Sequence, residues 1–326
     1  MTRYEIGERI GRGGICAVFR AFDNHLQREV AVKRLLPLEK TLLEEPDEGI
    51  LSREVLVLAR LQHPNVVTVY EFDEDENGPF AVLELIEGES LRKVIDDGAL
   101  SYSDFVEIAG QIIDPLISAM ELNLLHRDIK PENIMLSQLR SGRIQVKILD
   151  FGLAKITCKP RVQTVDLSGS FLGSVSYAAP EQFEHGLLDQ RTDLYSLGCV
   201  FYYALTQNSP FKGRNCAETM NNHLSHRVKP LQTFRPDLPR SICDFVMMLI
   251  ERDPADRPED ALEAYGLLRR AVALSKTPNG RLKRTRSPQS NGSKQAHHTL
   301  IATQDQTPAE ESRHEEAATM VAAAGY

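Results

Sequence analysis

The first part of the chain, up to about residue 87, consists of short apolar runs separated by turn residues. Three of these runs are rich in β-branched or aromatic side chains and predict β-strands: residues 29–33, 66–70 and 80–85. Asn77-Gly78-Pro79 predicts a turn before the last of them. Residues 50–61 differ, because their large apolar side chains recur at spacings of three and four and predict an amphipathic helix.

From about residue 88 onwards the apolar spacing is helical. Ser103 is a candidate N-cap for a long helix with one apolar face, made of Phe105, Ile108, Ile112, Leu116 and Met120. Pro115 lies inside this helix and predicts a kink or a break, because proline removes one backbone hydrogen bond. Residues 193–206 are apolar on almost every side and predict a buried helix.

The pattern ends near residue 271. Residues 271–326 are rich in Ser, Thr, Gln, Asn and Ala, and hold few large apolar side chains. Such a segment buries too little surface to offset the entropy lost on ordering, so we predict a disordered tail. The part from 276 to 294 carries several basic residues and no acidic one. It is either a solvated linker or a contact for a membrane surface or an acidic partner.

Composition and charge narrow the class of protein. The 326 residues are 42% hydrophobic and 26% charged, as in soluble globular proteins with about two units. The formal net charge of -8 excludes nucleic acid as the expected main ligand. We expect no transmembrane segment, because no apolar run approaches the required length, and no signal peptide. Five scattered cysteines without a Cys-x-x-Cys pair suggest neither zinc nor disulfides, and thus a cytoplasmic setting.

A glycine cluster, Gly11-Arg12-Gly13-Gly14-Ile15-Cys16-Ala17-Val18, lies between two predicted strands. Glycines allow backbone amides to approach phosphate oxygens, because no Cβ is in the way. Glycine-rich hairpins are common, so the cluster alone is a weak signal. Lys33 ends the run Val30-Ala31-Val32-Lys33 and is either a phosphate contact or a solvated surface charge.

Two longer strings are much more specific. They are His126-Arg127-Asp128-Ile129-Lys130-Pro131-Glu132-Asn133 and Asp150-Phe151-Gly152. Three further motifs follow in order: Ala179-Pro180-Glu181, then Asp193-Leu194-Tyr195-Ser196-Leu197-Gly198, then Asp253-Pro254 with Arg257-Pro258. In this order the motifs resemble the eukaryotic-like (Hanks-type) Ser/Thr protein kinases, particularly their compact bacterial members. The resemblance covers about residues 1–270.

The resemblance implies an α+β, two-lobed protein kinase fold. The small β-rich N-lobe with one main helix would span residues 1–87, and the larger helical C-lobe residues 88–270. A disordered polar tail, 271–326, would follow. ATP would lie between the lobes, together with Mg²⁺ or Mn²⁺.

The resemblance also assigns the catalytic roles. Asp128 would accept the proton of the attacking hydroxyl, and Lys130 would reach the γ-phosphate and favour Ser/Thr substrates. Asn133 and Asp150 would hold the metal ions, which prefer such oxygen ligands. Lys33 would contact the α and β phosphates and pair with Glu54. The full nucleotide set is Ile10, Gly11, Gly13, Gly14, Val18, Ala31, Lys33, Glu54, Leu83, Glu84, Ile86 and Met135.

Cys16 departs from the family pattern, because it stands where the third glycine of the loop is expected. It is either a small side chain tolerated in a mobile loop or a thiol near ATP that is sensitive to oxidation. The departure favours the competing hypothesis of a nucleotide-binding pseudokinase scaffold. A small-molecule phosphotransferase is disfavoured, because such enzymes generally lack the Ala179-Pro180-Glu181 segment.

Residues 150–181 resemble a regulatory loop that ends at Ala179-Pro180-Glu181. We expect activating phosphorylation at Thr164, Ser168 or Ser170, with Arg127 as the cation that binds the phosphate. Ser174 is expected to help to position the substrate. The resemblance further implies that Asp193 bonds the catalytic-loop backbone and that Arg257 and Glu181 form a buried ion pair.

The expected partners are proteins that present Ser or Thr, including the chain itself. A further hypothesis is that phosphorylated tail residues bind phosphothreonine-reading domains. The sequence thus predicts an ATP-dependent protein serine/threonine kinase.

Overall fold

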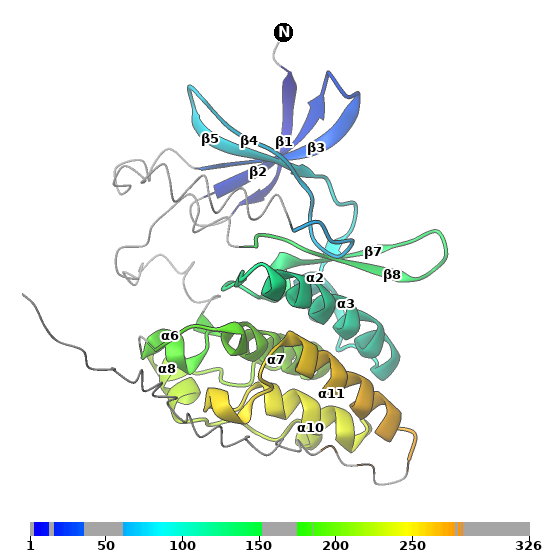
Figure 1. The fold of residues 1–326 in the computed structure, drawn as a ribbon, viewed down its shortest axis with the longest axis vertical. Helices are drawn as coiled ribbons and strands as arrows, with labels where there is room; N and C mark the ends of the chain where they lie inside the picture. Colours follow the sequence, from blue (N-terminus) through cyan, green and yellow to red (C-terminus); the bar gives the residue numbers. More distant parts are fainter. Residues whose placement is uncertain are drawn as a thin grey trace, which may run out of the picture. The chain divides into compact units, whose positions relative to one another are not determined.

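A computed structural model describes residues 3–12, 16–35, 61–151, 175–184, 186–277, 280 and 282. A five-stranded antiparallel sheet has the order β1-β2-β3-β5-β4 (Figure 1). Its strands are β1 Tyr4–Arg12, β2 Cys16–Asp23, β3 Arg28–Leu35, β4 Val69–Asp75 and β5 Gly78–Glu84. The α+β two-lobed prediction is confirmed, because a mainly helical part follows this sheet.

The helical part begins with a small three-stranded sheet, β6-β7-β8, formed by Glu89–Ser90, Ile134–Gln138 and Ile144–Ile148. Its longer helices are α2 Leu91–Asp97, α3 Tyr102–Glu121, α7 Gln190–Thr206, α8 Cys216–Leu224, α10 Arg240–Leu249 and α11 Ala261–Leu274. Short helical turns complete it: η2 Pro131–Asn133, α6 Pro180–Phe183, α9 Leu231–Phe234 and η3 Pro254–Asp256.

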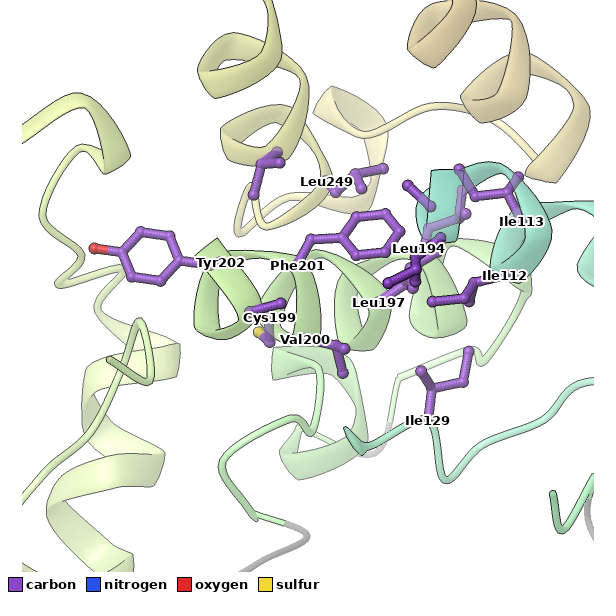
Figure 2. Close-up of a cluster of buried hydrophobic side chains, with 14 of the residues drawn as sticks. Ile112, Ile113, Ile129, Leu194, Leu197, Cys199, Val200, Phe201, Tyr202 and Leu249 are labelled. Carbon is purple, nitrogen blue, oxygen red and sulfur yellow. The ribbon is translucent and has the colours of Figure 1, made fainter. Parts of the chain in front are cut away.

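Helix α7 is the centre of the core, as its apolar sequence predicts. All of its residues from 192 to 206 are buried. Figure 2 shows Leu194, Leu197 and Phe201 of α7 among side chains of α3 and α10. A Cβ added at Gly198 would lie 2.6 Å from the Leu249 Cβ, so glycine is needed where α7 approaches α10.

Two predicted elements begin at other residues than the sequence suggested. Helix α3 starts after Ser101, not Ser103, because the Ser101 hydroxyl accepts a hydrogen bond from the Asp104 amide at 3.2 Å. The helix continues past Pro115 without a break. Strand β4 starts at Val69, and Val66 makes only an isolated bridge to Ile148. The predicted helix 50–61 falls outside the described residues, apart from Leu61.

Described structure continues past residue 270, where the sequence predicts the kinase domain to end. Helix α11 continues to Leu274, and Ala271 is buried. Leu282 is 3% exposed, and its amide donates to the Asp244 carboxylate at 3.3 Å. A single apolar side chain in a polar stretch carries no periodic signal, so the sequence did not reveal this contact. The predicted tail from 285 onwards falls outside the described residues.

Candidate active site

Residues 126–133, the string around Asp128, form a catalytic loop that is hydrogen-bonded to α7. The Asp193 carboxylate accepts hydrogen bonds from the amides of His126 and Arg127, each at 2.7 Å. Burial raises the pKa of Asp193. The electrostatic effect of His126 and the hydrogen bonds from these two amides oppose the shift. The predicted bond between Asp193 and the loop backbone is thus confirmed. His126 also reaches the Leu149 carbonyl at 2.9 Å through Nε2, which ties the loop to the end of β8.

Asp128 lies at the centre of a small polar cluster. The Lys130 ammonium is 2.7 Å from its Oδ2, and the Asn133 amide donates to the same oxygen at 3.1 Å. A second bond from Asn133, at 2.9 Å to the Asp128 carbonyl, fixes the orientation of the amide group. The three residues predicted to be catalytic therefore lie together, and the Asp128 side chain remains 36% exposed.

Asp150 lies two residues after β8, next to a residue that is bonded to Asn133. The Leu149 amide donates to the Asn133 carbonyl at 2.8 Å, so the residues before Asp150 pair with the start of β7. The Lys33 ammonium, on β3, lies 2.6 Å from the Asp150 carboxylate. The backbone of Asp150 has φ 58°, a left-handed conformation that is strained for this residue and typical of functional sites. Asp128, Asn133 and Asp150 are thus gathered in one region.

The residues predicted to surround the adenine share one apolar cluster. Ala31 and Leu83 are buried there as register partners on β3 and β5, and Val18, Ile86 and Leu149 pack against them. The Glu84 amide donates to the Thr68 carbonyl at 2.9 Å, which ties the end of β5 to the residue before β4. These positions place an apolar surface beside Lys33.

Three other predicted nucleotide residues, Ile10, Gly11 and Met135, are not members of this apolar cluster. Ile10 is 45% exposed on β1, Gly11 pairs with Val18, and Met135 is half-buried on β7 outside this apolar cluster. Several predicted residues fall outside the described part of the chain: Gly13, Gly14, Glu54, Thr164, Ser168, Ser170 and Ser174.

Cys16 is the first residue of β2 and is 7% exposed, so it belongs to the sheet and not to a mobile loop.

The predicted pair of Arg257 and Glu181 is confirmed. The guanidinium makes two bonds to the carboxylate, at 2.7 and 2.9 Å, and Arg257 is 0% exposed. The Thr192 hydroxyl adds a third bond to Glu181 at 2.9 Å. Burial alone would raise the pKa of Glu181, but these bonds hold it below its ordinary value.

Two polar contacts were not foreseen in the sequence. Lys147 of β8 pairs with Glu84 at 2.7 Å, and His223 of α8 lies 2.8 Å from the Tyr195 hydroxyl. Neither pair is close in sequence, and only Tyr195 stands in one of the motifs noted above. The fold makes these partners neighbours, and no local sequence pattern indicates it.

Comparison with known proteins identifies the class. Residues 4–266 match the protein kinase domain family, so the chain belongs to that family. It is 33% identical over 281 residues to a probable serine/threonine-protein kinase of Clostridium perfringens, covering 85% of this chain and 39% of that protein. It is 32% identical over 262 residues to the serine/threonine-protein kinase PrkC of Bacillus subtilis, covering 79% and 39%. The chain thus spans about two fifths of the length of these curated relatives.

Among solved structures, the chain is similar to Rad53 1-466 in complex with AMP-PNP. The TM-score is 0.65 at 28% identity, and the match covers 81% of this chain and 64% of that one. The resemblance to Hanks-type Ser/Thr kinases of bacterial type is therefore confirmed. No helix within the described ranges is both long and apolar enough to cross a membrane.

Proposed function

We propose that the chain is an ATP-dependent protein serine/threonine kinase. The observation that carries this proposal is the convergence of Asp128, Lys130, Asn133, Asp150 and Lys33, which come from β3, the catalytic loop and the end of β8. Membership of the protein kinase family supports the same activity. A residue set of this kind supplies alignment and charge stabilisation, which are the main requirements of phosphoryl transfer.

The chemistry assigns one role to each group. The Asp128 carboxylate orients a Ser or Thr hydroxyl and accepts its proton as the hydroxyl oxygen bonds to the γ-phosphorus. The bond from that phosphorus to the bridging oxygen breaks, and ADP leaves. Lys130, 2.7 Å from Asp128, lies where it can offset negative charge on the transferring group. Lys33 is placed to bind the remaining phosphates.

Magnesium fits the donor set. Asn133 has its amide nitrogen committed to Asp128, which leaves the carbonyl oxygen of the same side chain as a ligand. Asp150 supplies anionic oxygen, and magnesium usually takes one or two protein oxygens together with substrate phosphates. The ion would neutralise phosphate charge in this site. Lys33 and the metal ion would then share the Asp150 carboxylate, or the Lys33–Asp150 contact would rearrange when the nucleotide binds.

The experiment is transfer from γ-labelled ATP to a protein acceptor by the native chain and by Asp128→Asn. We expect native transfer to Ser or Thr, identified by mass spectrometry, and a loss of roughly 100-fold or more in the variant. Both proteins should bind nucleotide equally, because Asn keeps the size of the side chain. Nucleotide binding without transfer by the native chain would favour the pseudokinase alternative instead.

The proposal extends to regulation and location. Phosphorylation at Thr164, Ser168 or Ser170 would activate the enzyme through Arg127, and Ser174 would help to position the substrate. Tail phosphorylation would create docking sites for phosphothreonine-reading domains. A cytoplasmic location agrees with the use of ATP and with four cysteines that form no disulfide among the described residues. Alanine at all three loop positions should lower activity if this regulation operates.

A further inference from the structure

A histidine lies buried at the end of a helix that is otherwise largely exposed. His223 is in the last turn of α8 and is 0% exposed, whereas only Thr219 among the other residues of that helix is buried. Its ring lies 4.4 Å from the Phe211 ring and 6.0 Å from the Phe183 ring of α6. Burial of a polar ring is costly unless its nitrogens are satisfied, so this position needs an explanation.

One ring nitrogen is bound to the central helix. His223 Nδ1 lies 2.8 Å from the hydroxyl of Tyr195 on α7, which is also fully buried. Burial lowers the pKa of His223 to about 3 and raises that of Tyr195 well above its ordinary value. Both side chains are therefore neutral at physiological pH, and the ring carries one proton.

The other ring nitrogen, Nε2, is buried without a hydrogen bond of its own within the described ranges. The Ser176 backbone partly opposes the lowered pKa of His223. If Nε2 carries the proton, Nδ1 accepts a hydrogen bond from the Tyr195 hydroxyl. Because the ring also lies 6.0 Å from the Phe183 ring, His223 connects α7 to the segment that ends with α6.

Tyr177 of this segment is buried in the same hydrophobic cluster as Ile129 of the catalytic loop, residues 126–133. Burial raises the pKa of Tyr177, and the negative charge of Glu132 adds to this effect. Glu132 stands two residues after Lys130, so this segment is close to the groups proposed to transfer phosphate. Ser174, proposed above to help to position the substrate, directly precedes the segment in the sequence.

A second anchor holds the same segment further along. Glu181 is bound by Arg257, whose guanidinium also lies 4.6 Å from the Tyr195 ring centre. Tyr195 thus contacts both supports of residues 175–181: the ring packs on Arg257, and the hydroxyl meets His223. Loss of the hydroxyl alone would release the first support and keep the second.

We propose that His223, through its contacts with Tyr195 of α7 and Phe183 of α6, is a positioning residue for protein substrates. It fixes residues 175–177 beside the catalytic loop, so that the acceptor segment of the substrate meets Asp128. This inference rests on the proposed kinase function. The nucleotide contacts are on other elements, so the effect should fall on the protein substrate and not on ATP.

The test compares Tyr195→Phe with Tyr202→Phe in the full chain. Tyr202 is a matched control, because it is buried on the same helix and its hydroxyl donates to the Lys229 carbonyl at 2.9 Å. We expect Tyr195→Phe to raise KM for the protein substrate roughly fivefold, as for the loss of one hydrogen bond. KM for ATP should stay unchanged, and Tyr202→Phe should leave both constants close to native.

His223 itself is tested by two substitutions. His223→Leu removes both ring nitrogens and should raise the substrate KM at least as much as Tyr195→Phe. His223→Gln keeps a donor and an acceptor and should restore part of the loss. Equal effects of Leu and Gln, or parallel changes in KM for ATP and protein, would overturn the positioning role and indicate general destabilisation.

Hydrogen exchange separates this inference from the proposed function, because it needs no turnover. Amides of residues 175–184 should exchange faster in Tyr195→Phe than in the native chain, and those of residues 126–136 should not. Unchanged exchange in 175–184 would refute the inference even if the enzyme is active. An inactive native chain would refute the kinase function and leave the exchange comparison valid.

Discussion

Neighbouring cations on β3 have different surroundings. Lys33 has 12% of its side chain exposed and faces the Asp150 carboxylate, whereas Arg34 pairs with Asp75 at the edge of the sheet. Adjacent residues on a strand point to opposite faces, so only one of the two reaches the candidate site. The sequence alone left open whether Lys33 was a surface charge, and its contact with Asp150 answers that question.

Lys33→Met should therefore lower phosphoryl transfer roughly 100-fold, because a positioned charge on the phosphates is lost. The matched control is Arg34→Met, which removes a cation from the same strand and should keep activity within about twofold of native. Steady-state transfer from labelled ATP measures both variants. Equal losses in the two would show that the strand, and not the Lys33 charge, is responsible.

His223 makes stability depend on pH in a defined direction. Its pKa is about 3 in the fold against 6.5 as the ordinary value, so the unfolded chain binds a proton first on acidification. The full stability is present above pH 6.5 and declines as the pH falls toward 3. Between pH 6.5 and pH 5 the loss should be about 2 kcal/mol in the free energy of unfolding.

Urea unfolding of the native chain and of His223→Gln at pH 7, 6 and 5 measures this dependence. The other titrating groups are common to both proteins, so the difference between them isolates His223. The difference should shrink as the pH falls, because only the native chain loses the contribution. Parallel curves across the three pH values would show that His223 does not titrate on unfolding.

At the scale of elements, α7 organises both the core and the candidate site. Its first two turns carry Asp193, which holds the catalytic loop, and Tyr195, which lies against Arg257. The side chains that follow, shown in Figure 2, fill the space between α3 and α10. The fixed core thus transmits its position directly to the groups around Asp128.

The ion pair between α6 and the segment before α11 should contribute strongly to stability. Arg257→Met leaves the Glu181 charge buried with its main partner lost, at a cost of about 3–5 kcal/mol. The matched control is Arg214→Met, since Arg214 pairs with Glu218 at 2.9 Å but is 91% exposed on its side chain. That substitution should cost less than about 1 kcal/mol.

Chemical unfolding at pH 7 gives both values. The prediction fails if the two substitutions cost the same, because burial would then have no influence on the pair. It also has a consequence in acid: the lowered pKa of Glu181 means that the contribution persists above the ordinary carboxylate pKa and declines as the pH falls below it.

Elements whose signal is local could be predicted, and those set by distant contacts could not. The buried helix α7 was foreseen because its apolar residues are contiguous, and the grouping of Asp128, Lys130 and Asn133 because they stand in one short string. Strand β4 begins three residues later than predicted. Its acidic end faces solvent at the edge of the sheet and shows no alternation of apolar and polar residues. Leu282 was missed because its partners lie on α10.

At the scale of the whole compact unit, strand β8 joins the strand-rich and helical parts. The Ile148 carbonyl accepts from the Val67 amide at 2.9 Å, and the Ile148 amide donates to Asn65 at 2.8 Å. Lys147, beside it, donates to the Val66 carbonyl at 3.2 Å and pairs with Glu84 at the end of β5. These contacts fix Lys33 of the sheet relative to Asp150 of the helical part.

The Lys147–Glu84 pair should therefore couple the two parts energetically. The side chains are 11% and 27% exposed, and Glu84 also accepts from the Thr68 amide and hydroxyl at 3.2 Å. Lys147→Met leaves a partly buried carboxylate and the Val66 carbonyl without their donor, at a cost of about 2–4 kcal/mol. A double-mutant cycle with Glu84→Gln should give an interaction energy of about 1–3 kcal/mol, measured by urea unfolding.

The control is a second cycle on the Arg34–Asp75 pair, which lies within the sheet at a distance of 2.6 Å. Both cycles report local pairing. Only the substitutions of the first cycle should also weaken nucleotide binding, because Lys147, unlike Arg34, joins the sheet to β8, the strand that ends just before Asp150. An interaction energy near zero, or equal weakening of nucleotide binding in both cycles, would mean that the backbone contacts of β8 fix the two parts without this pair.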